Sequence, residues 1–579
     1  MKLTDVLAKI LKVNNIKNIF GLQGGAVVHI FDSLEKLKLN VTYNLHEESA
    51  ALAAVANAKA TNGVGCAVVT TGPACTNAIT GLLAAWQDSV PCIFISGQSR
   101  SNHTSYGKKV RQVGTQEVNI CDVVKPLTKY SKFINNKNNF QYEINKAIKI
   151  SKSGRPGPVW IDLPLEFQWS QIPLKKNLKV QIKNSEKLNN SQKKKIKKYF
   201  ENSKKPLLIL GFGLRSPTLD LKEIKKQIQK LNLPFVTTWN AADIFETKEK
   251  NNMGIIGMSG QRGANKIVFQ SDLLICLGTH LSIPHTTTLY ESYAKRAKKI
   301  IINIDGNQLK NLNIKFDLKI KSDLKYFFDY LNKSKIKINS NWNNTNKFKM
   351  FNWYNPIFNK YPNSDFFIRA YTSSIKKNVC LVVDGGGTAL YSGFQSSIIK
   401  KKDRLICSSA ISSMGTGLAE TIGVSESKKF QEIVCIIGDG SFLMNIQDLQ
   451  TIKQKNINVK ILLVNNNGYL AIRNTQKEFL NRRYFGTHPK WKLKMPNFKN
   501  VIKSFGISYC KLINRNNINK TIQYLNKSKG PIVCEIITDE NQLPLFKQGY
   551  KKISEDKFEP QTLQEMFPFV DKPISNTNN

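Results

Sequence analysis

The sequence predicts an α/β fold in which parallel sheets, covered by helices on both faces, recur in about three domains. Short unbroken apolar runs occur along the whole chain, and such runs are typical of strands buried on both faces. Stretches with apolar residues at helical spacing alternate with them, and Gly-rich turns separate the two kinds of segment. A length of 579 residues is enough for about three domains of ordinary size.

The clearest β-α-β unit spans residues 432–472. We expect strands at 433–437 and 459–464, with a helix between them whose apolar positions, from Ile446 to Ile452, recur at helical spacing. In open parallel sheets, ligands bind at the loops that follow the strands. Here those loops hold Gly438-Asp439-Gly440 and Asn465-Asn466.

These two loops carry residue types that bind a magnesium ion and a phosphate group. Asp439 supplies an anionic oxygen and Asn466 a neutral amide oxygen, and Mg²⁺ prefers oxygen ligands in octahedral geometry. The glycines let the backbone approach a diphosphate closely. A Gly-Asp-Gly tripeptide alone would indicate no more than a turn between a strand and a helix. Its spacing to the asparagine pair favours the binding function.

The same alternation of strands and helices continues on either side of this unit. We expect domains at residues 1–170, 190–332 and 365–555, with the first and third sharing one design. Polar, Lys-rich stretches at about 171–204 and 332–350 are predicted to be linkers. The Pro- and Asn-rich residues from about 560 onward are predicted to be frayed.

The formal charge of +45 raises the question of nucleic-acid binding. The lysines are scattered through every segment, and there is no zinc-finger spacing and no concentrated basic-aromatic tract. We therefore interpret the charge as a compositional bias spread over solvated faces, and expect no nucleic-acid partner. A nucleic-acid binder or a non-catalytic scaffold remains the alternative from another class of function.

Targeting and redox signals are also weak. No apolar run approaches the ~18 residues that span a bilayer, so we expect no membrane partner. The start of the chain reads as an amphipathic surface helix without a cleavage site. The ten cysteines form no C-x-x-C pair, and several lie in strand-like runs, which is typical of core cysteines in a reducing compartment. We expect a cytoplasmic protein.

Several motifs give the chain a resemblance to a known family. Gly438 to Ser441 followed by Asn465-Asn466 resembles the motif of thiamine-diphosphate (ThDP) enzymes. The motifs Gly-Gly-Ala, His-Glu, T-x-G-P-x-x-T-N-A-I-T-G, S-G-Q, Q-E and RPGPVWIDLP then occur in the order of the acetolactate synthase group. The resemblance to its large subunit covers about residues 1 to 550. It implies three doubly wound parallel-sheet domains: pyrimidine-binding, central and diphosphate-binding.

The resemblance implies the residues that hold ThDP and Mg²⁺. The metal ligands would be Asp439, Asn466 and the main-chain carbonyl of Gly468. Met414 matches the bulky residue that props the cofactor into its bent shape, although by type alone it would be core filler. The residues expected to contact the cofactor are Gly438, Asp439, Gly440, Ser441, Asn466, Gly468, Met414, Ser412, Thr76 and Asn77. Thr76 and Asn77 also open a predicted helix, whose free N–H groups suit an anion.

Three residues match catalytic positions. Glu47 matches the family's catalytic Glu, whose carboxyl bonds the pyrimidine ring; without the other motifs it would be a first-turn Glu stabilised by the helix dipole. Gln116 matches an active-site glutamine, and its alternative is an exposed loop amide. Gly25 would approach the reacting carbon or be a plain turn glycine. We interpret His46 as a structural neighbour of Glu47, and Glu48 as the more solvated of the pair.

The resemblance implies a ThDP- and Mg²⁺-dependent carboligase. It would decarboxylate a 2-keto acid, pyruvate in the first instance, and transfer the hydroxyethyl unit to an acceptor carbonyl. The alternative acceptor is a keto-sugar nucleotide of surface-polysaccharide biosynthesis. A homodimer or tetramer is implied, and a regulatory subunit is left open. FAD is also left open, because the family's central domain carries it in some members only and no G-x-G-x-x-G motif occurs here.

The sequence departs from the family pattern at several positions. Ala74 stands where Gly is usual, and Ser412-Ser413 replaces Gly-Thr before Met414. The Arg that in acetolactate synthases pairs with the acceptor carboxylate and helps to hold the flavin aligns with His280, and a Trp of the acceptor site aligns with Thr475. Both losses favour a changed acceptor, unless Lys129 or Arg473 takes over the carboxylate. Arg262 is a candidate phosphate partner for FAD.

Overall fold

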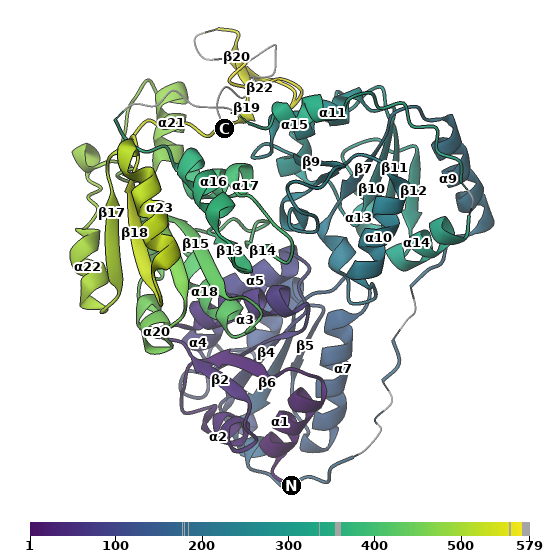
Figure 1. Ribbon diagram of the computed structural model, residues 1–579. Coiled ribbons are helices and arrows are strands. Elements are labelled where there is room, and N and C mark those ends of the chain that lie inside the picture. The colour runs from purple at the N-terminus through teal and green to yellow at the C-terminus, as the bar shows by residue number, and fades with distance from the viewer. Residues whose placement is uncertain are drawn as a thin grey trace.

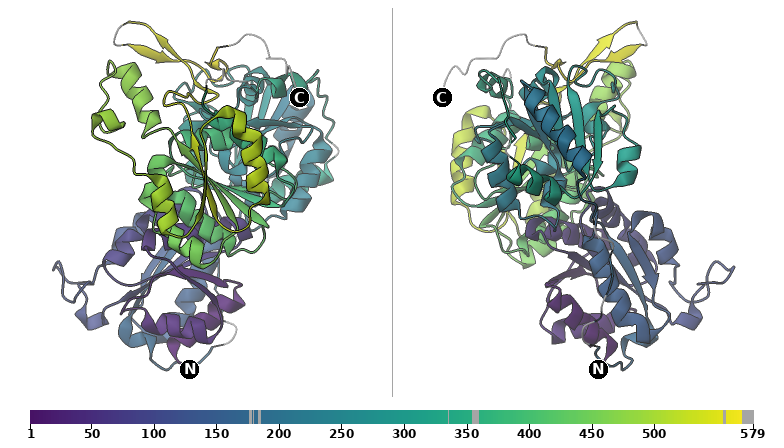
Figure 2. Two further views of the ribbon diagram at one scale, coloured as in Figure 1. Left: turned by 60° about the vertical axis from the view of Figure 1, so that its left-hand side comes forward. Right: turned by 90° about the vertical axis from the view of Figure 1, so that its right-hand side faces the viewer.

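The computed structural model describes residues 1–175, 178, 180–182, 185–334, 336–353, 360–554 and 557–569. It contains three parallel six-stranded sheets with flanking helices, which confirms the predicted fold class. In Figure 1 the first sheet, in purple and blue, lies below the other two, with the second in teal and the third in green and yellow. Figure 2 shows the same arrangement from two further sides.

The first sheet has the strand order β2-β1-β3-β4-β6-β5, and every neighbouring pair is parallel. Its helices cover both faces. The strands are β1 (Asn18–Gly21), β2 (Asn40–Tyr43), β3 (Gly65–Val69), β4 (Cys92–Gln98), β5 (Tyr130–Phe133) and β6 (Val159–Pro164), and the helices are α1 (Leu3–Val13), α2 (Val28–Lys36), α3 (Glu47–Thr61), α4 (Pro73–Asn77), α5 (Ile79–Gln87), α6 (Ile120–Val124), α7 (Phe140–Lys152) and α8 (Leu165–Gln168).

The third sheet repeats this design. Its order, β14-β13-β15-β16-β18-β17, is that of the first sheet when the strands of each are counted along the chain, which confirms the predicted internal repeat. The strands are β13 (Val379–Val383), β14 (Arg404–Ile406), β15 (Glu432–Gly438), β16 (Val459–Asn465), β17 (Ser508–Leu512) and β18 (Ile532–Ile537), and the helices are α16 (Ser364–Ser374), α17 (Gly387–Ser396), α18 (Thr416–Ser425), α19 (Asp439–Met444), α20 (Asp448–Gln454), α21 (Leu470–Phe479), α22 (Phe498–Ser504) and α23 (Ile518–Lys527).

The second sheet is wound differently, in the order β12-β11-β10-β7-β8-β9. Counted along the chain this is 3-2-1-4-5-6 read from the other edge, the order of dinucleotide-binding sheets. The strands are β7 (Pro206–Leu210), β8 (Phe235–Thr237), β9 (Asn252–Ile255), β10 (Leu273–Leu277), β11 (Lys298–Asn303) and β12 (Leu318–Lys321), and the helices are α9 (Asn190–Asn202), α10 (Leu221–Leu231), α11 (Arg262–Gln270), α12 (Ile283–Thr286), α13 (Gly306–Lys310), α14 (Leu324–Lys333) and α15 (Asn346–Met350).

A continuous core joins the first and third sheets. Helix α3, a run of small residues, packs along α18, and a Cβ added at Gly423 would lie 2.0 Å from the Ala53 carbonyl oxygen. The Asn57 amide donates to the Gly423 carbonyl at 2.9 Å. Buried side chains of both domains belong to one hydrophobic cluster. The small side chains of α3 therefore let the two helices approach closely, which fixes the two domains against each other.

Three predictions about the connections are wrong in part. The stretch 171–204 contains α9, and 332–350 contains α15, whose Phe348 is buried against α11. The segment after 540 forms two short antiparallel pairs, β19 (Lys547–Gln548) with β22 (Met566–Phe567) and β20 (Tyr550–Lys552) with β21 (Phe558–Pro560). Composition does not reveal α15 and the two strand pairs because tertiary packing, not local propensity, stabilises such short segments. Residues 570–579 lie outside the described part.

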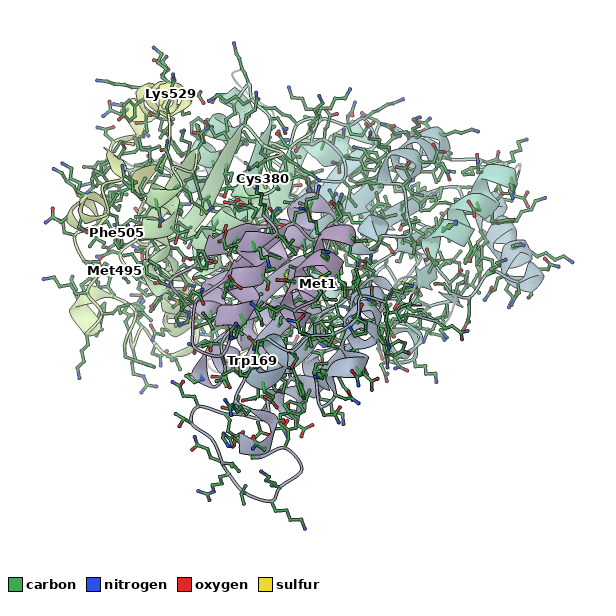
Figure 3. The ribbon with its side chains drawn as sticks, turned by 90° about the horizontal axis from the view of Figure 1, so that it is seen from below. Met1, Trp169, Cys380, Met495, Phe505 and Lys529 are labelled. Carbon is green, nitrogen blue, oxygen red and sulfur yellow. The ribbon has the colours of Figure 1, made fainter. Side chains whose placement is uncertain are left out.

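The expectations for the first helix and for the cysteines are confirmed. Helix α1 buries the predicted apolar face, including Leu3, Leu7 and Leu11. All ten cysteines are free, and all but the half-buried Cys510 are buried. Seen from below in Figure 3, where Met1 and Trp169 are labelled, charged side chains project all round the molecule, as expected of a charge that is spread out. In the described part of the chain, no helix is both long and apolar enough to cross a bilayer.

Candidate functional site

The predicted magnesium site lies at the carboxyl edge of the third sheet. Strands β15 and β16 are adjacent and parallel, with Gly438 opposite Val464. Their following loops therefore emerge side by side. Asp439 begins α19 directly after β15, and Asn466 follows the last residue of β16. Sequence spacing alone placed these two residues in loops, and the strand pairing brings the loops together.

Asp439 is buried and bridges the two loops. Its Oδ1 accepts a hydrogen bond from the Gly440 N–H at 2.8 Å, and its Oδ2 accepts one from the Gly468 N–H at 2.8 Å. Burial raises the pKa of the carboxyl to about 6, against the opposing effect of these backbone donors. The carboxylate is thus held in place by two backbone donors, and each oxygen keeps lone pairs for a cation.

Asn466 points an unsatisfied oxygen into the same place. The residue is 4% exposed, and its Nδ2 donates to the Thr388 hydroxyl at 3.4 Å. Its Oδ1 is buried and has no hydrogen-bond partner among the described residues. Leaving a buried amide oxygen unpaired costs about 1–3 kcal/mol. A hard cation would satisfy this oxygen, so the donor set of Asp439 and Asn466 fits Mg²⁺.

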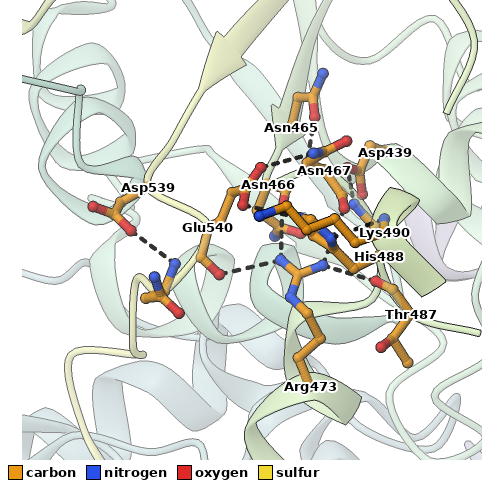
Figure 4. A network of polar contacts seen from close by, with 12 residues as sticks. Asp439, Asn465, Asn466, Asn467, Arg473, Thr487, His488, Lys490, Asp539 and Glu540 are labelled. Carbon is orange, nitrogen blue, oxygen red and sulfur yellow. Dashed lines mark hydrogen bonds and ion pairs between the residues drawn. The ribbon is translucent and has the colours of Figure 1, made fainter. Parts of the chain in front are cut away.

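Arg473 secures the asparagine loop, as Figure 4 shows. Its Nη2 donates to the carbonyls of Asn466 at 2.6 Å and Glu540 at 3.1 Å, and its Nη1 donates to those of Asn467 at 3.0 Å and Thr487 at 2.8 Å. One buried guanidinium therefore joins three segments. The sequence does not reveal this role, because two of the four carbonyls, those of Thr487 and Glu540, belong to other segments, and main-chain acceptors leave no residue signature.

Gly468 must be glycine in this arrangement. Its φ is +120°, and a Cβ there would lie 2.4 Å from the Thr487 carbonyl oxygen. A side chain would thus meet both conformational strain and a backbone clash. The Gly468 carbonyl, the third predicted metal ligand, accepts from the Leu470 N–H at 3.2 Å and retains a second lone pair.

Two further predicted residues of this domain, Met414 and Ser441, lie against Gly386, which follows β13. A Cβ at Gly386 would lie 2.4 Å from Met414 Cγ and 2.8 Å from Ser441 Oγ. Asp384 accepts from the N–H groups of Gly386 and Gly417, both at 3.0 Å, and burial raises its pKa to about 6. The half-buried Met414 therefore lies against the loop that follows β13, in the same domain as Asp439.

Gly440 is closely packed, and Ser412 has a left-handed backbone conformation. A Cβ at Gly440 would lie 2.2 Å from the Tyr469 ring, whereas Gly438 has open space beside it. The exposed Ser412 has a φ of +50°, and its hydroxyl donates to the Ser409 carbonyl at 2.6 Å. At this position Ser stands where the family has Gly, and the Ser adopts a left-handed backbone conformation.

In the first domain, Glu47 is the first residue of α3 and is 8% exposed. Its Oε2 accepts a hydrogen bond from Asn77 Nδ2 at 3.0 Å, which joins two predicted site residues. His46 caps the helix, accepting from the Glu48 N–H through Nδ1 at 3.2 Å, in line with the structural role we expected. Glu48 is half-buried, and burial raises its pKa.

Gln116 and Gly25 lie at the same end of the first sheet. A Cβ at Gly72, which precedes α4, would lie 2.4 Å from the Gln116 carbonyl oxygen. The Thr71 hydroxyl donates to that carbonyl at 3.0 Å. The Gln116 side chain is exposed, and Gly25 is exposed with open space where a Cβ would be. Thr76 is exposed too, with its hydroxyl donating to the Pro73 carbonyl at 2.9 Å.

The site residues thus form two groups, one in each domain. Glu47, Asn77, Gln116 and Gly25 belong to the first, while Asp439, Asn466, Gly468, Met414 and Ser412 belong to the third. Within the chain, the N-terminal turn of α3 contacts the third domain through the Ser49 hydroxyl, which donates to Asn445 Oδ1 at 3.3 Å.

A cavity of about 1070 Å³ lies at the carboxyl ends of the second sheet and extends against the first domain. It includes the point between β7 and β10 where the strand order reverses, lined there by Gly213, Gly278 and His280. Burial lowers the pKa of His280 to about 4, so its imidazole is neutral. Arg155, of the RPGPVWIDLP motif, also lines the cavity and donates to Asp305 at 3.1 Å.

The predicted alternative cations are engaged elsewhere. Arg262 donates to the Pro568 carbonyl and lies 4.7 Å from the Phe546 ring centroid, and it does not line the cavity. Lys129 does line it, but its ammonium donates to the carbonyls of Ile150 and Ser153. Arg473 is held by four carbonyls. Thr475 is exposed on α21, and its hydroxyl donates to the Ala471 carbonyl at 3.3 Å.

Comparisons with known proteins agree with this architecture. Three thiamine pyrophosphate enzyme models match the chain: the N-terminal TPP binding domain at residues 1–123, the central domain at 194–331 and the C-terminal TPP binding domain at 385–536. The acetolactate synthase large subunit of Cyanidium caldarium is 30% identical, with 94% of each chain covered.

Two further relatives are similar over nearly the whole chain. The acetolactate synthase large subunit of Haemophilus influenzae is 28% identical over 93% of this chain and 94% of its own. Acetolactate synthase 2, chloroplastic, of Nicotiana tabacum is 28% identical over 94% of this chain and 84% of its own. Since these likenesses extend over nearly the whole chain and its three domains, the protein belongs to the thiamine-pyrophosphate-dependent enzymes, among those similar to the acetolactate synthase large subunit.

Proposed function

We propose that this enzyme is a Mg²⁺- and ThDP-dependent carboligase that takes a two-carbon unit from pyruvate and transfers it to an acceptor carbonyl. The observation that carries the proposal is the buried, unpaired Oδ1 of Asn466 next to the fixed carboxylate of Asp439. Such a pair suits a divalent cation that also binds a diphosphate. Asp439, Asn466 and the Gly468 carbonyl would hold Mg²⁺.

The surrounding residues fit the rest of the cofactor. Gly438 leaves open space, and Gly440 brings the backbone close, as a diphosphate requires. Ser441 is buried beside Gly386, near Met414, which would support the cofactor's bent shape, while the Ser412 carbonyl would hold the aminopyrimidine. When bound, ThDP supplies the electron sink that makes decarboxylation of a 2-keto acid feasible.

Glu47 would serve as the acid of the first domain. Asn77 Nδ2 fixes Oε2, which leaves Oε1 free to hold a proton against the pyrimidine ring. Low exposure keeps water from competing for that hydrogen bond. Gln116 would orient the substrate oxygen, and the open space at Gly25 would admit the reacting carbon.

Two kinds of molecule are candidates for the acceptor: a second pyruvate and a keto-sugar nucleotide. A neutral His280 and an exposed Thr475 offer no cation and no indole for a small keto acid. Lys129 and Arg473 are bonded to main-chain carbonyls, which weighs against their taking over a carboxylate. These features support a bulkier acceptor, a keto-sugar nucleotide, over a second pyruvate.

The second sheet would hold a dinucleotide of the FAD type. The supporting observations are the strand order and the cavity at its switch point. Gly211, Gly213 and Gly278 approach so closely there that a Cβ on any of them would lie within 2.8 Å of another backbone atom. Arg155 lines this cavity and Arg262 does not, so Arg155, although it also pairs with Asp305, is the better candidate for a phosphate partner.

The assembly would be a homodimer or tetramer. Glu47 and Asp439 lie in different domains, and a ThDP molecule that reaches both would bridge two chains, as the family resemblance implies.

The test is Mg²⁺-dependent ThDP binding, measured by isothermal titration calorimetry. Asp439→Ala and Asn466→Leu should each abolish the Mg²⁺-dependent part of the binding. Asn467→Ala is the control, because that neighbouring amide donates to Glu540 at 2.7 Å. Mass spectrometry of products from pyruvate and a panel of carbonyl acceptors then identifies the acceptor. Unchanged binding in both variants would contradict the proposed site.

A further inference from the structure

Two fully buried polar side chains lie behind the proposed active site and have no role so far. Gln98 is the last residue of β4, in the S-G-Q motif, and Asp162 lies on the neighbouring β6, in the RPGPVWIDLP motif. Both are 0% exposed. Polar groups so deep in a core are costly unless each atom is paired, and here they are paired with segments of the proposed site.

Gln98 uses its whole hydrogen-bonding capacity. Its Nε2 donates to Asp162 Oδ2 at 3.0 Å and to the Val118 carbonyl at 2.9 Å. Its Oε1 accepts from the Thr71 hydroxyl at 2.9 Å and from the Ser99 N–H at 2.9 Å. One side-chain amide thus joins β6, the loop after β3 and the loop that precedes α6.

Each of these two loops leads to a proposed site residue. Thr71 is followed by Gly72 and then by α4, whose last residue, Asn77, donates to Glu47. Val118 lies two residues after Gln116 on the other loop. The segment between β4 and α6 projects from the first domain (Figure 2), so its inner end needs an anchor in the core.

The two loops also touch each other directly. A Cβ at Gly72 would lie 2.4 Å from the Gln116 carbonyl oxygen. The Thr71 hydroxyl lies 2.9 Å from Gln98 Oε1 and 3.0 Å from the Gln116 carbonyl oxygen, both acceptors. A hydroxyl has a single hydrogen, so it is shared between Gln98 in the core and the loop that carries Gln116.

Asp162 holds the nitrogen side of the Gln98 amide, in agreement with its two backbone partners. Its Oδ1 accepts from the Ser96 hydroxyl at 2.6 Å, whose oxygen accepts from Trp160 Nε1 at 2.9 Å. Its Oδ2 accepts from Gln98. The Ser99 N–H can only donate and the Val118 carbonyl can only accept, so these backbone groups require the amide oxygen to face Thr71 and the amide nitrogen to face β6, where Asp162 accepts from it.

We propose that Gln98, held by Asp162, is a positioning residue that locks the Thr71–Asn77 segment and the Thr115–Val118 loop together, and so places Gln116 and Asn77 for catalysis. The placement of the loops follows from the contacts. Its catalytic consequence rests on the proposed roles of Gln116 and Glu47. A misplacement of about 1 Å can lower a rate by roughly 100-fold.

The first experiment removes one hydroxyl. Thr71→Val keeps the side-chain shape, so the fold should persist while hydrogen–deuterium exchange of the 113–120 peptide rises. We expect kcat to fall about tenfold with little change in KM, and Thr71→Ser to restore both quantities. Thr42→Val is the matched control, because Thr42 is a buried threonine of the same domain whose hydroxyl has no hydrogen-bond partner among the described residues.

The second experiment exchanges the hydrogen-bond donor and acceptor between residues 98 and 162. In Gln98→Glu, a carboxylate oxygen takes the place of Nε2 and faces two acceptors, Asp162 Oδ2 and the Val118 carbonyl, so kcat should fall by about 100-fold. Adding Asp162→Asn supplies a donor toward residue 98, and the double variant should regain at least about tenfold of the lost kcat and part of the exchange protection. Rescue by the second change distinguishes positioning from a general loss of stability.

Exchange and turnover test different parts of the inference. Unchanged exchange at residues 113–120 in Thr71→Val and Gln98→Glu would overturn the positioning role. So would activity losses that merely follow the melting temperature, with exchange raised over the whole domain. If exchange responds as expected while Gln116→Leu turns over normally, the positioning stands and the proposed function of Gln116 fails.

Discussion

At the residue scale, the candidate chemistry depends on what surrounds each carboxyl. Asp439 is fixed by two backbone donors, Glu47 by a single amide, and Asp448, the first residue of α20, lies at the interface with α3. Residue type alone does not distinguish these three acidic side chains; only the motifs around Asp439 and Glu47 do so in the sequence. Their surroundings support the proposed metal ligand and the proposed proton donor, and they leave Asp448 as a buried structural group.

The Glu47→Gln variant should keep the fold and ThDP binding but lose about 10²–10⁴-fold in turnover, because only proton transfer is removed. Steady-state kinetics with pyruvate, together with calorimetric ThDP binding, measure this. The neighbouring Glu48→Gln is the control and should remain close to wild type. Near-normal turnover in Glu47→Gln would contradict the role of Glu47.

Asp448→Asn should stabilise the protein, and more so at high pH. Burial raises the pKa of Asp448 to about 7, and the nearby Ser49 hydroxyl offsets this only in part. Because the folded pKa lies above that of the unfolded chain, the free energy of unfolding falls as the pH rises from about 4 to about 7. Asparagine lacks this titration. The gain in melting temperature should therefore be larger at about pH 8 than at about pH 5. Equal gains at both values would contradict it.

At the element scale, helix starts and strand ends carry the site. Glu47 opens α3, Asp439 opens α19, and Asn466 and His280 follow β16 and β10. Such positions expose backbone N–H groups and lie at the carboxyl edges of parallel sheets. In the second sheet the same rule places the cavity at the switch point between β7 and β10.

Gly278→Ala should abolish flavin binding if the switch point holds FAD. A Cβ there would lie 2.8 Å from Gly213 Cα, and the φ of +63° is already unfavourable for alanine. Gly506→Ala isolates the conformational strain, because Gly506 has a φ of +67° with only a flexible Lys453 side chain nearby. Flavin absorbance of the purified variants is the measurement. A wild-type protein with no flavin, and no response to added FAD, would exclude the cofactor.

At the scale of the whole molecule, there are two kinds of sheet, and the second sheet lies between the first and third in the chain. The first and third sheets share a strand order and meet through α3 and α18, while the second sheet lies over the cavity next to the first domain. A reaction that needs both Glu47 and Asp439 therefore depends on how whole domains, and whole chains, are assembled.

Two inactive variants should restore activity when combined. Glu47→Gln and Asp439→Ala lie in different domains, so a mixed dimer whose sites bridge two chains keeps one intact site. Random mixing should give about a quarter of wild-type turnover. Co-expression followed by kinetics measures this, with each variant alone as the control. A mixture as inactive as its parts would show that each site is built within one chain.

The acceptor prediction also belongs to this scale, because its residues come from all three domains. Pyruvate alone should give weak acetolactate formation, and a bulky keto-sugar nucleotide should speed pyruvate consumption. The reasons are the neutral His280 and the engagement of Lys129 and Arg473 with carbonyls. Efficient, saturable acetolactate synthesis from pyruvate, unimproved by any sugar acceptor, would contradict it.

The sequence by itself determined the fold class and the local chemistry. Apolar runs and helical spacing predicted the buried strands, and the Gly438–Ser441 and Asn465–Asn466 motifs placed their oxygens in loops, because these features depend on residues close together in the chain. Short elements such as α15 and β22 escaped prediction, since their stability comes from contacts with distant residues.

Only the tertiary structure decided which residues meet. The sequence allowed Arg473 to bind the acceptor carboxylate, but in the structure Arg473 donates to four main-chain carbonyls. Arg262 donates to the Pro568 carbonyl and lies outside the cavity, which Arg155 lines instead. The bond from Asn77 to Glu47 and the network of Gln98 join segments that are far apart in the chain. The orphaned oxygen of Asn466 is likewise visible only once its neighbours are known. Hydrogen-bond satisfaction is a property of three-dimensional packing, and residue type alone does not specify it.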